Sequence, residues 1–136
     1  MLKLIIGVKG TGKTKALINM VNTAVENSQG NVVCIEKGDK LTYDVKHQAR
    51  LIDTKQYFVS DAQSLYGFVA GILASNHDVT DLFVDSALKI CNNDVAAFDK
   101  FVDAVSALVE KVDVNVVMTS SIPVEDASET VKKYVI

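Results

Sequence analysis

Short apolar runs alternate along the chain with longer segments that have helical periodicity. Each run is bounded by polar or glycine residues and is mainly apolar, without the strict apolar–polar alternation of a half-buried strand. This composition is typical of strands buried on both faces of a parallel sheet. Four runs have this character: Leu2–Ile6, 31–35, 82–84 and 114–118.

Three intervening segments repeat their apolar residues every three or four positions, which predicts helices. The first covers 15–27 and is followed by Gly30 as a stop signal. The second begins at Ser60, where Gln63 completes a capping-box pattern, and extends to about Asn76. Asn93 is the expected cap of the third, which covers 94–112. Strands alternating with helices predict a three-layer α/β/α fold with a mainly parallel sheet of about five strands.

Two parts of the chain have a weaker pattern. Within 37–60, Leu41–Tyr43 and Ala49–Ile52 are possible short strands, which suggests a small hairpin insertion at about 38–58. The final segment, 125–136, is expected to form a short helix followed by an edge strand at 134–136.

The segment Gly7-Val8-Lys9-Gly10-Thr11-Gly12-Lys13-Thr14 matches G-x-x-x-x-G-K-[ST], the Walker A motif, directly after the first apolar run. Glycines allow the tight turn that brings successive backbone N–H groups around a polyphosphate. Lys13 would reach the β- and γ-phosphates, and Thr14 would offer its hydroxyl to Mg²⁺. The following helix, with Lys15 in its first turn, would add the positive end of its dipole.

A second candidate element is Leu82-Phe83-Val84-Asp85, an apolar strand ending in an aspartate. This is the form of a Walker B element, whose carboxylate holds Mg²⁺. Thr119 and Ser120 follow the run at 114–118, where a hydroxyl could reach a γ-phosphate or its attacking water; the same residues also commonly form turns.

Composition limits the class of protein. The 136 residues predict a single domain over 1–136, and no apolar run is long enough to span a bilayer, so we expect a cytoplasmic protein without a membrane partner. Cys34 and Cys91 lack disulfide or zinc spacing and are expected as free thiols. Residues 1–60 carry a charge of +4 and residues 61–136 a charge of −7, which places phosphate in the basic half. A negative net charge and the absence of Trp make a nucleic-acid partner unlikely.

With these elements placed, the chain resembles a minimal P-loop NTPase, in the branch that includes the RecA-like and AAA+ ATPases and the type II thymidine kinases. The resemblance is specific at Gly7–Thr14 and extends to Asp85. It implies the P-loop NTPase fold, with Lys13 on the phosphates of ATP, Thr14 and Asp85 on Mg²⁺, and Thr119 or Ser120 as a polar sensor. It also implies that the strand at 114–118 lies between the first strand and the Walker B strand.

One position departs from this pattern. Many of these ATPases have a glutamate directly after the Walker B aspartate to orient the attacking water, and here that residue is Ser86. Glu36, at the end of the second strand, is a possible substitute, because a glutamate on a neighbouring strand has this role in RecA-like proteins; a solvent-exposed residue is the alternative. Arg50 is the only arginine, so slow turnover is expected.

The leading hypothesis is an Mg²⁺-dependent ATP-binding protein with slow ATPase activity that reports nucleotide state to a protein partner or to another copy of itself. ATP is expected over GTP, because no Asn-Lys-x-Asp pattern is present. A non-catalytic nucleotide-binding module is the alternative, supported by Ser86. A small-molecule kinase of the nucleoside type is disfavoured by the single arginine.

Overall fold

Five parallel strands form one sheet at the centre of the molecule. The computed structural model describes all residues from Met1 to Ile136. The strands are β1 (Leu2–Ile6), β2 (Asn31–Glu36), β3 (Arg50–Asp53), β4 (Val79–Val84) and β5 (Asn115–Ser120). Their order in the sheet is β1-β5-β4-β2-β3, and every neighbouring pair is parallel. The predicted parallel sheet is confirmed, and β5 lies between β1 and β4 as expected.

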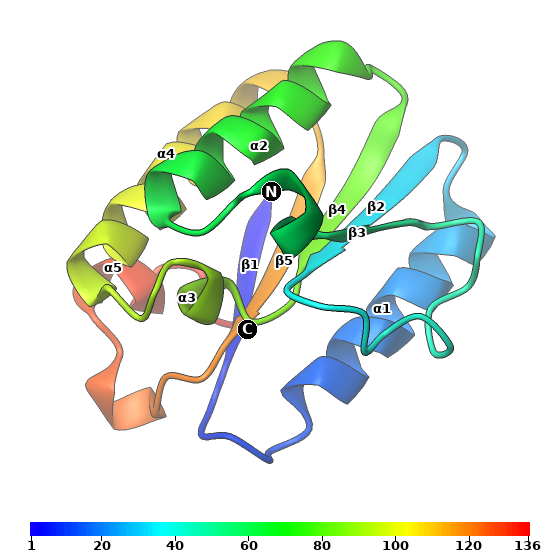
Figure 1. Cartoon of the computed structure of the whole chain (residues 1–136). Helices are drawn as coiled ribbons and strands as arrows, with labels where there is room; N and C mark the ends of the chain where they lie inside the picture. The colour runs from blue at the N-terminus through cyan, green and yellow to red at the C-terminus, as the bar shows by residue number, and fades with distance from the viewer.

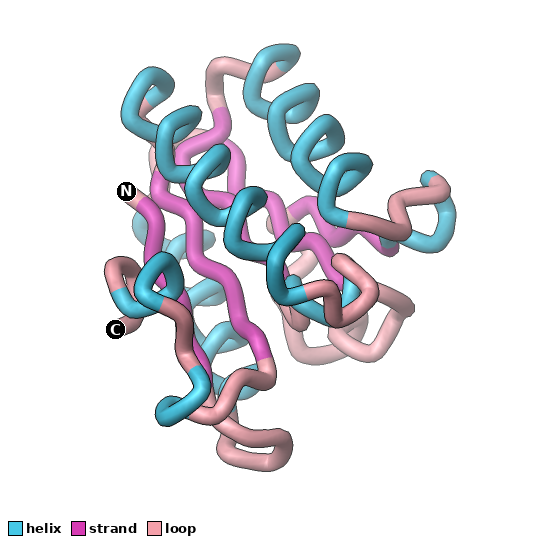
Figure 2. The backbone as a smooth tube through the Cα atoms, turned by 90° about the vertical axis from the view of Figure 1, so that its left-hand side faces the viewer, coloured by secondary structure: helices cyan, strands magenta, loops and turns pink.

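Helices cover both faces of this sheet, so the molecule has three layers. One face carries α1 (Lys13–Asn27), and the other carries α2 (Ala62–Ser75) and α4 (Val95–Val112), which pack side by side. Figure 1 shows this division, and the view turned by 90° shows the strands between the helices (Figure 2). The short helices α3 (Ala87–Ile90) and α5 (Glu129–Lys132) and the 3-10 turns η1 (Thr54–Tyr57) and η2 (Val124–Asp126) complete the fold. The α/β/α architecture is therefore confirmed.

The sheet divides the apolar core into two clusters, because successive side chains of a strand point to opposite faces. On β4, Leu82 and Val84 pack with the larger cluster beneath α2 and α4, whereas Phe83 packs with the smaller cluster beneath α1. The same alternation continues past the ends of the strands. It decides which polar side chains meet at the carboxyl edge of the sheet.

The long helices occupy the predicted segments, but their caps differ by one residue. Asp61, not Ser60, caps α2: its carboxylate accepts from the Ser64 N–H, and Ser64 Oγ accepts from the Asp61 N–H in return. Asp94 caps α4 through the Ala97 N–H. Both caps are carboxylates, whose charge also interacts favourably with the positive end of the helix dipole.

The predicted hairpin at 38–58 is wrong. Residues 41–43 form turns, in which the Leu41 carbonyl accepts from the N–H groups of Asp44 and Val45. Leu41 and Val45 pack into the cluster beneath α1, so this segment covers the sheet where a helix would otherwise lie. The second predicted strand exists as β3, but it pairs parallel to β2.

The chain end returns to β1. The predicted short helix is present as α5, but 134–136 contribute a single bridge in place of the predicted edge strand. After α5, the Tyr134 carbonyl accepts from the Leu4 N–H at 2.8 Å, and the Ile136 N–H donates to the Leu4 carbonyl at 3.0 Å. Leu4 and Val135 form a single parallel bridge. The outer edge of β1 is therefore partly covered.

Two predictions from composition concern cysteines and membrane spans. Cys34 and Cys91 are free and buried, as expected, and burial raises the pKa of each thiol to about 12. Both thiols are therefore protonated at neutral pH, which disfavours a nucleophilic role. None of the helices combines the length and apolar character that a transmembrane helix requires.

Candidate functional site

The connection from β1 to α1 is an open loop with unpaired backbone donors. Gly10 and Gly12 both have φ of 86°, a left-handed conformation that glycine adopts without strain. The Thr11 hydroxyl donates to the Val8 carbonyl at 2.8 Å and holds the loop in shape. None of the N–H groups from Val8 to Lys15 donates a hydrogen bond to another protein group. Eight successive donors at the start of a 15-residue helix form a surface suited to an anion.

Asp85 connects three elements at the carboxyl edge of the sheet. Its Oδ1 accepts hydrogen bonds from the hydroxyl of Thr14 at 3.0 Å and from the hydroxyl of Thr119 at 2.8 Å. Thr119 Oγ1 also accepts from the Ser86 N–H at 2.8 Å. The first turn of α1, the end of β4 and the end of β5 therefore meet at one carboxylate, so the predicted Thr14–Asp85 pair lies in contact.

Thr119 and Ser120, which the sequence left equivalent, point to opposite faces of the sheet. Thr119 shares the α1 face with Asp85, because each is two residues beyond a side chain of the α1-side cluster, Val117 and Phe83. Ser120 points to the other face, where its hydroxyl accepts from the Leu88 N–H and donates to the Thr119 carbonyl. Thr119 is thus a site residue, whereas Ser120 anchors α3 and does not line the site.

A cleft of about 480 Å³ opens beside Asp85 and is strongly cationic. Its lining contains one carboxylate, that of Asp85, and five lysines: Lys9, Lys13, Lys15, Lys40 and Lys89. None of these lysines takes part in any of the three salt bridges of the molecule. The Lys13 ammonium donates to the Val8 carbonyl at 2.9 Å, a contact that a stronger acceptor can replace.

The lining matches most of the predicted nucleotide-binding loop. Lys9, Gly10, Gly12, Lys13, Thr14 and Lys15 all line the cleft. Gly7, Val8 and Thr11 belong to the same loop but lie outside this lining. Sequence reasoning missed Lys40 and Lys89, which reach the cleft from the turn after β2 and from α3. Only the register of the sheet could have placed them, because neither belongs to a motif.

Glu36 is buried. The alternative interpretation, that it is a solvent-exposed residue at the end of a strand, is therefore wrong. Only 3% of its surface is exposed, and its Oε2 accepts from the Leu41 N–H at 3.2 Å. Burial raises the pKa of Glu36, and the nearby charges of Asp85 and Asp53 add to that effect. Leu41 lines the cleft and Glu36 does not. The Glu36 carboxylate therefore lies behind the turn that contains Leu41. The role of Glu36 in positioning water stays a prediction.

The donor set around Asp85 suits a hard cation only in part. No group of three or more His, Cys, Asp or Glu side chains is arranged to hold a metal ion. Thr14 and Asp85 provide one hydroxyl and one carboxylate, both oxygen donors of the kind that Mg²⁺ prefers. Such a pair fits a Mg²⁺ ion that takes its remaining ligands from water and from phosphate oxygens.

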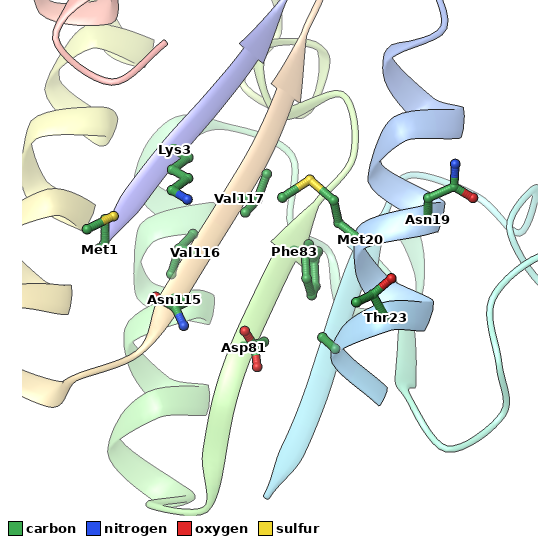
Figure 3. Close-up of a pocket in the computed structure, with 11 residues that line it drawn as sticks. Met1, Lys3, Asn19, Met20, Thr23, Asp81, Phe83, Asn115, Val116 and Val117 are labelled. Atoms are coloured by element: carbon green, nitrogen blue, oxygen red, sulfur yellow. The ribbon is translucent and has the colours of Figure 1, made fainter. Parts of the chain in front are cut away.

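A second hollow of about 410 Å³ lies beneath α1, toward the amino ends of β1, β4 and β5. Figure 3 shows Met20 reaching from α1 toward Val117 and Phe83, with Lys3 and Asp81 at the rim. Six of its eleven lining residues are hydrophobic. This groove contains neither a loop of free N–H groups nor a cluster of lysines.

Arg50, the only arginine, lies outside both hollows. It is exposed at the start of β3, and the residues that line the cationic cleft do not include it. Any positive charge that the chain itself brings to the cleft therefore comes from lysine.

Comparison with known proteins gave no match, either to protein-family models or to curated proteins.

Proposed function

We propose that this chain is a P-loop NTPase that binds ATP with Mg²⁺ in the cationic cleft and hydrolyses it slowly. The observation that carries the proposal is the run of eight unpaired N–H groups from Val8 to Lys15, which lies beside the Thr14–Asp85–Thr119 hydrogen bonds. Main-chain donors, a lysine and a Mg²⁺-type oxygen pair are the three components that a triphosphate requires.

The position of β5 between β1 and β4 supports the same proposal, because the resemblance implied that strand order. Lys13 would leave the Val8 carbonyl and bind the β- and γ-phosphates. When bound, Mg²⁺ would neutralise phosphate charge near Thr14 and Asp85. Thr119 positions the Asp85 carboxylate from the neighbouring strand.

Slow turnover follows from what the cleft contains. Asp85 is the only carboxylate in its lining, and no arginine lies there. Ser86 occupies the position after Asp85, and its hydroxyl lies 3.5 Å from Asp85 Oδ2. The same observations favour the second candidate, a module that binds nucleotide without chemistry and signals through the loops at this edge, either to a protein partner or to a second copy.

Binding is tested by thermal unfolding with Mg-ATP, with Mg-GTP and without nucleotide. ATP at a hundredfold excess over Kd should stabilise the fold by about 2.7 kcal/mol, which is roughly 8–12 °C in Tm for a domain of this size. Lys13→Ala should remove the shift. Lys100→Ala, which changes an exposed lysine on α4, is the matched control and should retain it. An unchanged Tm with ATP would reject the proposal.

Hydrolysis is tested separately by phosphate release. We expect a slow rate in the wild type and a further decrease in Glu36→Gln, provided that the loop at Leu41 moves and exposes the carboxylate. Binding without phosphate release would instead select the non-catalytic module. Release that Glu36→Gln leaves unchanged would remove Glu36 from the mechanism.

A further inference from the structure

A smaller pocket of about 240 Å³ lies on the same edge of the sheet as the cationic cleft but has different walls. It is lined by Lys37, Lys55, Phe58, Val59, Ser60 and Ile90. Lys37 directly follows Glu36, and Ile90 directly follows Lys89 of the cleft. The turn after β2 and helix α3 therefore separate two neighbouring hollows.

Asp53 holds together the two segments that carry the pocket's lysines. Its Oδ1 accepts from the Gly38 N–H at 2.8 Å and from the Lys55 N–H at 2.9 Å. These two hydrogen bonds lower the pKa of Asp53, so this carboxylate is ionised at neutral pH and offsets part of the Lys55 charge. No acidic side chain lines the pocket, and neither Lys37 nor Lys55 forms a salt bridge. Two ammonium groups are therefore available to an anion.

Phe58 is the unusual residue at the rim of this pocket. It is 90% exposed, and its φ of 57° places it in the left-handed region at the end of η1, where glycine is the common residue. A bulky aromatic side chain is strained in that conformation, and here it buries almost no surface in return. An aromatic ring that stabilises nothing in the fold and stands beside two cations is suited to stacking on a flat ligand.

The remaining contacts give the pocket a fixed shape. Val59 and Ile90 are buried and supply apolar surface next to Phe58. The Asn92 side-chain amide donates to the Ser60 carbonyl at 2.6 Å and fastens the segment after α3 to the opposite wall. The pocket is therefore preorganised by hydrogen bonds from two sides.

We infer that this pocket binds a second ligand, a phosphorylated nucleoside, with its base stacked on Phe58 and its phosphate between Lys37 and Lys55. Lysine pairs bind phosphate, and aromatic faces bind bases of any sequence by stacking. The ligand unit is either a free nucleoside monophosphate or one nucleotide of a single strand. The site is independent of Lys13, so it stands or fails apart from the proposed ATP site.

Isothermal titration calorimetry with nucleoside monophosphates and with a short oligodeoxythymidylate tests this inference. Phe58→Ala should weaken binding roughly 5- to 100-fold, and Lys37→Ala or Lys55→Ala should also weaken it. Tyr43→Ala removes another fully exposed aromatic side chain, at 98% exposure, and should have no effect. Much tighter binding of the oligonucleotide identifies a strand as the ligand, and equal binding identifies the free nucleotide.

Two further variants keep the result interpretable. Phe58→Gly suits the backbone conformation, so it should abolish stacking while raising Tm, which excludes unfolding as the cause of lost affinity. Lys13→Ala should leave binding unchanged. The inference is wrong if none of the probes binds, if Phe58→Ala binds as tightly as wild type, or if Lys13→Ala abolishes binding, which would place the ligand in the cationic cleft.

Discussion

The cationic cleft and the groove beneath α1 are similar in size but opposite in chemistry. Their volumes are about 480 Å³ and 410 Å³. Two of the fifteen residues that line the cleft are hydrophobic, against six of eleven in the groove. The cleft is lined by residues that follow β1, β2, β4 and β5 at the carboxyl edge of the sheet. The groove lies between α1 and the opposite part of the sheet (Figure 3).

The difference teaches that volume alone does not identify a functional site. The groove follows from incomplete cover, because α1 is the only helix on its face and β1 lies at the edge of the sheet. The cleft instead combines free main-chain donors, unpaired lysines and a hydrogen-bonded carboxylate. The free N–H groups form no hydrogen bond within the protein and the lysines form no salt bridge, and the proposed ligand site rests on these unused groups.

Removal of a side chain from the groove should produce the largest loss of stability. Phe83 is 3% exposed and packs beneath α1, so Phe83→Ala should lower the free energy of unfolding by about 3–5 kcal/mol. Urea unfolding measures this change. Val8→Ala, in the exposed loop of the cleft, should change stability by less than about 0.5 kcal/mol. If the comparison is right, Phe83→Ala molecules that remain folded still gain stability from Mg-ATP.

Removal of a carboxylate from the cleft should have an intermediate effect, on affinity rather than on folding. If Asp85 holds Mg²⁺ as proposed, Asp85→Asn would remove the charged ligand of the ion, and Mg²⁺-dependent ATP affinity should decrease roughly 10- to 100-fold. Calorimetry with and without Mg²⁺ measures this change. The matched variant in the groove is Asp81→Asn, since Asp81 also accepts a threonine hydroxyl, that of Thr80, at 2.9 Å. Equal losses in both variants would contradict the distinction between the two hollows.

The smallest effect concerns Glu36 and pH. Burial raises the pKa of Glu36 in the folded state, so ionisation at neutral pH opposes folding, whereas below about pH 4.5 the group is protonated in both states. Glu36→Gln should therefore be more stable than wild type at pH 7 to 8, with a difference that shrinks on acidification and vanishes below about pH 4.5. Thermal unfolding across this range measures it. A Glu36→Gln protein that is less stable than wild type at pH 7 to 8, with a deficit that disappears on acidification, would show instead that the hydrogen bond from Leu41 stabilises the carboxylate.

Most of the strands and the long helices could be predicted from the sequence, because the patterns that specify them lie within each segment. Buried strands such as Leu2–Ile6 and the helix over 95–112 have continuous patterns, and the motif at Gly7–Thr14 specifies its own strand and helix. The turns at 41–45 were mistaken for a strand because Leu41 and Val45 are apolar for a different reason: they cover the sheet beside α1.

What the sequence could not predict depends on register and on contacts between distant segments. Thr119 faces the site and Ser120 does not, because successive side chains of a strand point to opposite faces of the sheet. Which of the two shares a face with Asp85 depends on the register of β5 against β4, in which Val84 pairs with Met118. Lys40 and Lys89 join the cleft from separate connections of the sheet. The sequence does not single out Phe58, because its positive φ is a property of the folded backbone and belongs to no sequence motif.

A structure of the protein with a non-hydrolysable ATP analogue and Mg²⁺ tests the central claim most directly. We predict that the terminal phosphates lie in the cationic cleft, with N–H groups of 8–15 directed at their oxygens and with the Lys13 ammonium moved from the Val8 carbonyl to the phosphate. Nucleotide bound in the groove beneath α1, or a loop in which Lys13 keeps its contact with Val8 at saturating analogue, would contradict the account.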